Sequence, residues 1–318
     1  MNESLAHSVR RLIAGQLSSW ETARNNYAAL AHIQSKTVDF GRFRIDVQFN
    51  PERARSTTAP VETGIKRPCF LCAANRPAQQ EAVRWKDYDI LVNPYPIFDP
   101  HLTIPAADHI PQRLTGRLGD MAELAAELPD FVVLFNGARS GASAPDHFHF
   151  QAVAKGVLPA QSELPEWERR SVLQEGEDVL VWAADDYLRP AVVIEGKTAA
   201  ETAQAGEQIL ACLKGITREP DEAQVNAMAW QDTGKYTLVF FPRTAHRPRQ
   251  FYAEGEEQFL FSPGAVDMAG VMITVREPDY RRADAPLMND LYAQVVPGAG
   301  LWEHIKTELT LCLARNRK

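Results

Sequence analysis

Hydrophobic positions near the N-terminus recur with the period of an α-helix and then change to the alternation of a β-strand. Between Leu5 and Trp20 the apolar residues stand three to five positions apart, and they follow Ser4, a residue type that caps helix N-termini. From residue 37 to residue 50 apolar and polar side chains alternate, and Pro51 ends the run. The pattern predicts an amphipathic packing helix followed by extended structure.

Two later stretches of the chain share one order of predicted elements. The first has strand-like runs at residues 90–92 and 102–104, a helical run at 118–128, and strand-like runs at 131–135 and 147–153. The second has strand-like runs at 179–182 and 191–194, a helical run at 198–213, and strand-like runs at 225–230 and 236–241. Both are β-β-α-β-β, which indicates a duplicated α+β unit, although a generic mixed α/β protein can produce this order by chance.

The duplication defines the expected fold class. We expect an α+β protein whose two similar halves form an intramolecular pseudo-dimer, with antiparallel sheets and flanking helices. The 318 residues, of which 45% are hydrophobic, suffice for one large domain or two modest ones. Leu301, Ile305 and Leu309 predict an amphipathic helix that closes the chain.

Charge and hydropathy exclude several classes of partner. The chain has 34 Lys and Arg against 41 Asp and Glu, a net charge of −7, so it lacks the basic field of a nucleic-acid-binding protein. No apolar run approaches the roughly 20 residues that span a bilayer, and the N-terminus lacks a signal-peptide pattern. We expect a cytoplasmic protein that binds neither nucleic acid nor membrane.

The four cysteines divide into a pair and two single residues. Cys69 and Cys72 form a CxxC motif, whereas Cys212 and Cys312 stand alone in helical patterns. A disulfide scaffold is therefore not expected. We predict that Cys212 and Cys312 pack as small apolar side chains on helices.

The string from Asp146 to Val153 combines aromatic and polar side chains at alternate positions. On a strand, alternate side chains point to opposite faces, so His147, His149 and Gln151 would share one face while the intervening residues enter the core. A surface strand with two ordinary histidines is the alternative. Three convergent polar groups in register favour a functional site.

The CxxC motif has two chemical interpretations. A gap of two residues lets both thiolates reach one tetrahedral ion, whereas a redox pair would need a thioredoxin-like βαβ pattern that does not follow it here. A zinc site needs two further ligands. The candidates are His109 and His147, and His101 competes with His109.

Several motifs occur in an order that resembles one protein family. They are Cys69-Phe70-Leu71-Cys72-Ala73-Ala74-Asn75, Asn93 before a Pro-aromatic turn, Asp108-His109 before a helix, Asn136-Gly137 after a strand, and His147-x-His149-x-Gln151. This order resembles the galactose-1-phosphate uridylyltransferase branch of the histidine-triad (HIT) superfamily, which includes diadenosine tetraphosphate phosphorylases and GDP-hexose phosphorylases. The resemblance covers residues 53–153 well and residues 236–243 and 270–276 loosely.

The resemblance implies a division of labour between the two halves. Residues 1–165 would be an N-terminal HIT-like catalytic half with the zinc site, and residues 166–318 a degenerate HIT-like half with the closing helix. His149 would be the nucleophile that takes a nucleotidyl group, and Gln151 would donate hydrogen bonds to phosphoryl oxygens. Cys69, Cys72, His109 and His147 would hold a structural zinc ion, because four protein ligands leave no position for water.

The resemblance also suggests residues that contact the substrate. Asn93 and Asn136 would contact the nucleotide, although Asn before Pro94 and Asn before Gly137 are also ordinary turn formers. Ser143 would belong to the glycine-rich loop before the histidines, although Asp146 stands where the family usually has proline. Arg53 and Arg55 resemble a substrate-binding segment of the uridylyltransferases. Most charge runs are solvated, so no role is assigned to the basic run at residues 243–249.

These inferences together predict a nucleotidyltransferase that acts through a covalent nucleotidyl-histidine. We expect a nucleotide-sugar phosphorylase or a hexose-1-phosphate nucleotidyltransferase, with a nucleoside-diphosphate sugar or a dinucleoside polyphosphate as donor and phosphate or a sugar phosphate as acceptor. Alternatives are a dinucleoside polyphosphate phosphorylase, a nucleotide hydrolase, and a zinc-stabilised nucleotide-binding module without activity. The protein would be a monomer or a homodimer.

Overall fold

A computed structural model describes residues 3–53 and 68–315. The helices are α1 (Leu5–Ser19), α2 (Glu21–Ala29), α4 (Leu118–Glu127), α5 (Pro159–Glu163), α6 (Ala199–Thr217), α7 (Ala265–Met268), α8 (Glu277–Arg282), α9 (Ala285–Ala293) and α10 (Ala299–Arg315). The strands are β1 (Gln34–Asp39), β2 (Arg44–Phe49), β3 (Ala82–Trp85), β4 (Tyr88–Val92), β5 (His101–Pro105), β6 (Phe131–Asn136), β7 (His149–Ala154), β8 (Arg170–Glu175), β9 (Val179–Ala184), β10 (Val192–Gly196), β11 (Val225–Asp232), β12 (Lys235–Pro242) and β13 (Val271–Thr274). No helix in these described segments is both long and apolar enough to cross a membrane.

The N-terminal patterns form the predicted elements with one addition. The side chain of Ser4 accepts a hydrogen bond from the backbone N–H of His7 and caps α1, as expected. The alternating run from residue 37 to residue 50 is not a single strand. It belongs to an antiparallel hairpin, β1 and β2, whose turn contains Gly41 at φ +83°.

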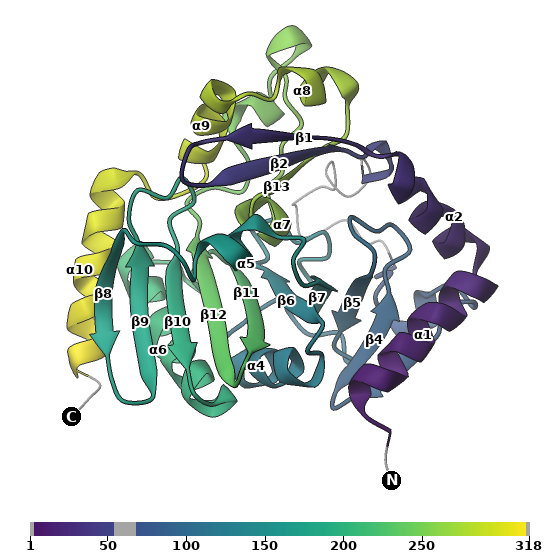
Figure 1. The fold of residues 1–318 in the computed structure, drawn as a ribbon, viewed down its shortest axis with the longest axis horizontal. Helices are drawn as coiled ribbons and strands as arrows, with labels where there is room; N and C mark the ends of the chain where they lie inside the picture. Colours follow the sequence, from purple (N-terminus) through teal and green to yellow (C-terminus); the bar gives the residue numbers. More distant parts are fainter. Residues whose placement is uncertain (1–2, 54–67, 316–318) are drawn as a thin grey trace.

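The two predicted β-β-α-β-β stretches form one ten-stranded sheet. Its order is β3-β4-β5-β7-β6-β11-β12-β10-β9-β8, so the second repeat runs outward from the centre in the mirror order of the first (Figure 1). The repeats join where β6 and β11 pair antiparallel, with Asn136 opposite Asn226. The expected α+β fold of two similar halves forming an intramolecular pseudo-dimer is confirmed.

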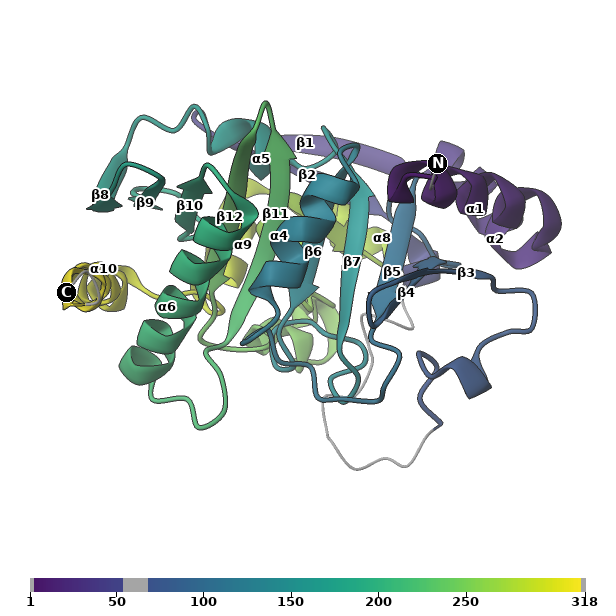
Figure 2. The ribbon, with the colours of Figure 1, turned by 90° about the horizontal axis from the view of Figure 1, so that it is seen from below.

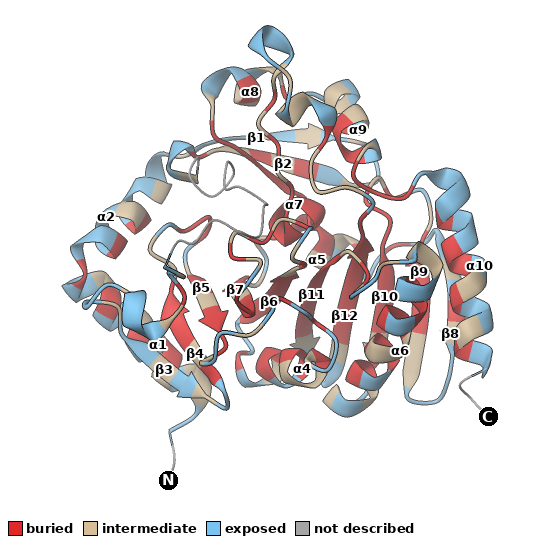
Figure 3. Cartoon of the chain, turned by 180° about the vertical axis from the view of Figure 1, so that it is seen from behind, coloured by how far each residue is buried: buried red, intermediate tan, exposed pale blue. Residues whose placement is uncertain are grey.

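The large sheet has a core on each face. Helices α4 and α6 lie against one face in Figure 2, and apolar side chains of α1, α4, α6 and α10 form one core there with Phe148, Phe150 and Ala152 of the sheet. A second core forms on the opposite face with the three-stranded sheet β1-β2-β13 and helix α7. Both faces of the central strands are consequently buried (Figure 3). The alternation expected around the paired histidines is confirmed, because the aromatic residues enter the first core.

The strand expected at residues 147–153 begins two residues late. The backbone N–H of His147 donates to the carbonyl of Ala144 in a turn, and that of Phe148 donates to Ile110 in a loop. The ladder with β5 therefore starts at His149, and the ladder with β6 starts at Gln151. His147 lies at the strand entrance, where it can turn toward a loop.

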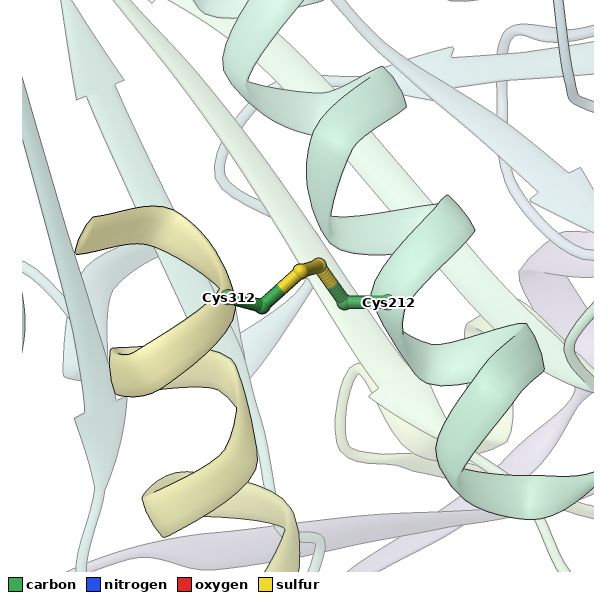
Figure 4. The surroundings of a disulfide bond; sticks show 2 residues. All are labelled: Cys212 and Cys312. Atoms are coloured by element: carbon green, nitrogen blue, oxygen red, sulfur yellow. A yellow bond between two sulfur atoms is a disulfide. The ribbon is translucent and has the colours of Figure 1, made fainter. Parts of the chain in front are cut away.

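The prediction for Cys212 and Cys312 is wrong. The two residues form a disulfide between α6 and α10, with 6.4 Å between their Cα atoms (Figure 4). Each helix has the apolar face that was expected, but helical periodicity does not reveal that these two faces lie side by side. The bond closes a loop of 100 residues and fixes the C-terminal helix to the second repeat.

Removing this disulfide should destabilise the protein without altering its fold. The double substitution Cys212→Ser and Cys312→Ser is expected to lower the free energy of unfolding by about 2–5 kcal/mol, because a cross-link over a long loop restricts the unfolded chain. Urea denaturation of both proteins, with and without a reducing agent, measures the effect. The reducing agent should lower the free energy of unfolding of the wild type only. Equal stability of the wild type and the variant without reducing agent would contradict the disulfide.

Candidate active site and metal cluster

Four predicted ligands converge next to the entrance of β7. The sulfur of Cys69 lies 3.3 Å from Nδ1 of His147, and the sulfur of Cys72 lies 3.2 Å from Nδ1 of His109 and 3.5 Å from Nδ1 of His147. All four candidate ligand atoms lie within 4.8 Å of one another. Tetrahedral zinc with ordinary bond lengths would separate a sulfur from a nitrogen by about 3.5 Å. The residues therefore fit a four-coordinate metal ion.

A hydrogen bond orients the ring of His147 for this role, and a carboxylate lies near the ring of His109. Nε2 of His147 donates to the carbonyl of Ala106 at 2.8 Å, which leaves Nδ1 as the nitrogen with a lone pair facing the sulfurs. Nε2 of His109 lies 3.5 Å from a carboxylate oxygen of Asp146. Burial lowers the pKa of His147, so its ring is neutral as a metal ligand must be.

The CxxC segment is a short turn anchored to the large sheet. The N–H of Cys72 donates to the carbonyl of Cys69, and Arg76 connects the carbonyl of Leu71 at 2.8 Å with the carboxylate of Asp89 on β4 at 2.8 Å. Both cysteines are free thiols in contact with histidines. This arrangement favours the metal interpretation over a redox pair.

His149, the first residue of β7, is buried with 3% of its surface exposed. Its Nδ1 lies 2.9 Å from the carbonyl of His147, and because a carbonyl only accepts, Nδ1 carries the proton. Nε2 then holds the lone pair. Within the described residues this atom has no hydrogen-bond partner. Burial lowers the pKa of His149 to about 4, so the ring is neutral near pH 7.

Gln112 fixes the backbone around this histidine. Its Oε1 accepts from the N–H of His149 at 2.7 Å, and its Nε2 donates to the carbonyls of His149 at 3.0 Å and Asn136 at 2.9 Å. Sequence analysis missed Gln112. No local sequence pattern marks a glutamine that bridges two strands. The one available signal is that Gln112 lies three residues after His109, in the loop that carries this candidate metal ligand.

A pocket open to solvent lies on the face of the large sheet that carries Gln151. The first half lines it with Arg53, Ile97, Asn136, Gly141, Ser143 and Gln151, and the second half with Ser262, Gly264, Ala265, Val266, Asp267 and Ile273. Four of the residues predicted to contact substrate thus line this pocket, namely Arg53, Asn136, Ser143 and Gln151. The second-half wall, including a carboxylate, was not predicted.

The glycine-rich loop is close to this second wall. Gly141 has φ +93°, and a Cβ there would lie 2.7 Å from Cα of Gly264. Asn136 joins the same contact, because its Oδ1 accepts from the N–H of Ala265 at 2.6 Å and from Asn226 at 2.9 Å. Asp267 is nearly buried, and burial raises its pKa to about 6. Contacts between the two halves of the chain therefore hold the two walls of the pocket together.

Of the residues predicted to contact substrate, Arg53 lines the pocket and Asn93 does not. Nη1 of Arg53 donates to the carbonyl of Tyr95 at 2.7 Å, and burial lowers its pKa to about 10. Arg55 lies outside the described residues. Asn93 accepts from the N–H of Tyr95 at 2.9 Å, as a turn-forming asparagine does, and it is not among the residues that line the pocket. Its contact with a nucleotide stays a prediction.

His101, the alternative zinc ligand, and Arg243, in the basic run without an assigned role, both lie outside the metal cluster. His101 lies against Gln151 with 2.8 Å between Nε2 and Oε1. Arg243, in the basic run, is buried and donates to four backbone carbonyls and to Asn226. Arg243 therefore fixes loops of the second half.

Comparisons with known proteins agree with this fold. A family model described as a domain of unknown function (DUF4922) matches residues 12–154. No curated protein matches the sequence. The yeast Ap4A phosphorylase Apa2 in complex with Ap4A has a similar structure, with a TM-score of 0.63, 14% identity, and coverage of 93% of this chain and 98% of that one. The same enzyme in complex with AMP gives a TM-score of 0.58 at 14% identity, covering 90% of this chain and 98% of that one.

At this identity the likeness establishes the fold. The phosphorylase belongs to the branch that the motifs resemble, so the recognition of a HIT-like fold is confirmed. A uridylyltransferase structure aligns with a TM-score of 0.47, 13% identity, and coverage of 89% of this chain and 99% of that one. That alignment is too distant to support an inference.

Acid should destabilise the protein partly through His101. Burial lowers the pKa of this histidine from 6.5 to about 3, so below pH 6.5 the unfolded chain binds a proton that the folded protein excludes. Stability is fully present above pH 6.5 and falls by about 1.4 kcal/mol per pH unit through this group as pH drops toward 3. His101→Phe should remove this part of the slope in urea denaturation between pH 6.5 and 4.5.

The exposed His304 supplies the matched control for loss of an imidazole, as His304→Phe. An unchanged slope in His101→Phe would show that His101 is not held neutral.

Proposed function

We propose that the protein is a nucleotidyltransferase that works by double displacement on His149. The observation that carries the proposal is the hydrogen bond from Nδ1 of His149 to the carbonyl of His147, which leaves the lone pair on Nε2, two residues before Gln151 in the pocket lining. A neutral imidazole so oriented is a nucleophile. The HIT-like fold and the His-x-His-x-Gln motif support the same role.

The proposed reaction has two balanced steps. The lone pair of Nε2 attacks the α-phosphorus of a nucleotide donor, a P–N bond forms, and the P–O bond to the remainder breaks with its electrons on the leaving oxygen. An oxygen of the acceptor then attacks the phosphorus, and the P–N bond breaks to restore neutral His149. Gln151 would donate hydrogen bonds to phosphoryl oxygens, and Arg53 would supply positive charge in the pocket. The catalytic half would be residues 1–165.

Two classes of donor fit the site. A solved complex of the structurally similar phosphorylase contains Ap4A, which favours a dinucleoside polyphosphate. The carboxylate of Asp267 in the pocket wall favours a nucleotide sugar, because carboxylates accept hydrogen bonds from sugar hydroxyls and repel further phosphates. Orthophosphate as acceptor would make either enzyme a phosphorylase.

We propose a structural zinc ion at Cys69, Cys72, His109 and His147. A closed set of four ligands would hold the entrance of β7, and His147 both faces the cluster and accepts from His149 through its carbonyl. The metal would thus act on catalysis through the position of His149.

Replacing the nucleophile should abolish nucleotidyl transfer. His149→Asn is expected to lower kcat by at least about 10³-fold, since the residual rate of a nucleophile variant comes from binding alone. Donor screening should use UDP-, GDP- and ADP-sugars and dinucleoside polyphosphates, with and without phosphate. Intact-protein mass spectrometry should find a nucleoside monophosphate adduct in the wild type only.

The exposed His304→Asn variant is the control and should behave as the wild type does. Product formation that is independent of phosphate would instead identify a hydrolase, and binding without turnover or adduct would identify a nucleotide-binding module. Full turnover by His149→Asn would refute the nucleophile.

Elemental analysis should find one zinc ion per chain. Cys72→Ser is expected to lose the metal and to lower both thermal stability and kcat, because metal binding is coupled to folding at such sites. The Cys212→Ser and Cys312→Ser variant controls for cysteine loss and should keep its zinc. Active wild-type protein without metal would contradict the ligand set.

A further inference from the structure

We infer that His101 is a positioning residue that fixes the side-chain amide of Gln151, with its oxygen turned to His101 and its NH₂ group turned to the pocket. The inference rests on the proposed function for the identity of the group that the NH₂ would contact, namely the transferred phosphoryl group. His101 itself would not touch substrate.

The first step is the tautomer of His101. The backbone N–H of Ile97 lies 3.1 Å from Nδ1 of His101. A backbone N–H can only donate, so Nδ1 is an acceptor and carries no proton. A neutral imidazole has one donor and one acceptor nitrogen, which places the proton on Nε2.

The second step is the orientation of the glutamine. Nε2 of His101 lies 2.8 Å from the side-chain amide of Gln151. Because Nε2 donates, the amide atom that faces it must be the oxygen Oε1, and the NH₂ group points the other way. The orientation therefore follows from a backbone group whose role is unambiguous, through one side chain, to another.

The third step is the rigidity of the histidine. His101 is fully buried on β5, and the hydroxyl of Tyr27 bonds both its backbone N–H, at 3.2 Å, and its carbonyl, at 2.9 Å. The N–H of Asn93 donates to the same carbonyl at 2.9 Å. Burial, reinforced by the charge of Arg53, lowers the pKa of His101 to about 3, so the ring stays neutral. Because Nδ1 of this neutral ring accepts from Ile97, Nε2 carries the proton and cannot accept from the NH₂ group of Gln151.

The last step is the position of Gln151. It stands two residues after His149 on β7, on the same face, and it lines the pocket. Within the described residues its Nε2 has no hydrogen-bond partner. A phosphoryl oxygen beside His149 could therefore accept from it, whereas a flipped amide would present a repelling oxygen. Without His101 both orientations would be available.

Nuclear magnetic resonance of ¹⁵N-histidine-labelled wild-type protein tests the tautomer directly and needs no substrate. The expected result is a neutral His101 with its proton on Nε2 between pH 6 and 8, and His101→Asn, which removes the ring, assigns the signal. A proton on Nδ1, or an imidazolium, would overturn the inference even if nucleotidyl transfer is confirmed. Absence of transfer with every donor would defeat the proposed function and leave this result readable.

A double-mutant cycle then tests the coupling to Gln151. Gln151→Ala is expected to lower kcat/KM by about 10–100-fold, and His101→Phe to lower it by a similar factor in the wild-type background. In the Gln151→Ala background, His101→Phe should cost less than about threefold, because the group it positions is gone. His101→Asn repeats the cycle if the Phe variant does not fold. Additive losses would assign His101 to packing and overturn the inference.

Discussion

The hydrogen bond between Nδ1 of His149 and the carbonyl of His147 is the interaction on which the proposed chemistry depends. It places the proton on Nδ1 and leaves the lone pair on Nε2. The same residue, His147, turns its own ring to the cysteines because Nε2 is bonded to Ala106. Two consecutive constraints thus connect the metal cluster to the ring that would attack phosphorus.

The fold brings the two walls of the pocket together within one chain. The two repeats share a single sheet, and their junction at β6 and β11 places Asn136 beside Asn226 and the segment around Gly264. The first half of the chain provides the paired histidines, and the second half provides a pocket wall that includes Asp267. The second repeat has no histidine on β12, the strand that corresponds to β7.

Local periodicity predicted those features whose causes are local. Alternation along a strand placed Phe148 and Phe150 in a core opposite His149, and CxxC spacing placed two sulfurs at one point. The resemblance added His109, which spacing alone could not choose over His101. The disulfide, the bridge made by Gln112 and the Asp267 wall join segments tens of residues apart or more. Their contacts depend on sheet register and helix packing, which no short pattern encodes.

The attachment site of the nucleotide tests the central claim most directly. Wild-type protein incubated with a donor labelled at the α-phosphorus can be digested and sequenced by tandem mass spectrometry, with ³¹P resonance identifying the bond type. The account predicts an acid-labile phosphoramidate on the peptide that contains His149, and on that residue alone. A label on another side chain, or on an oxygen, would contradict it.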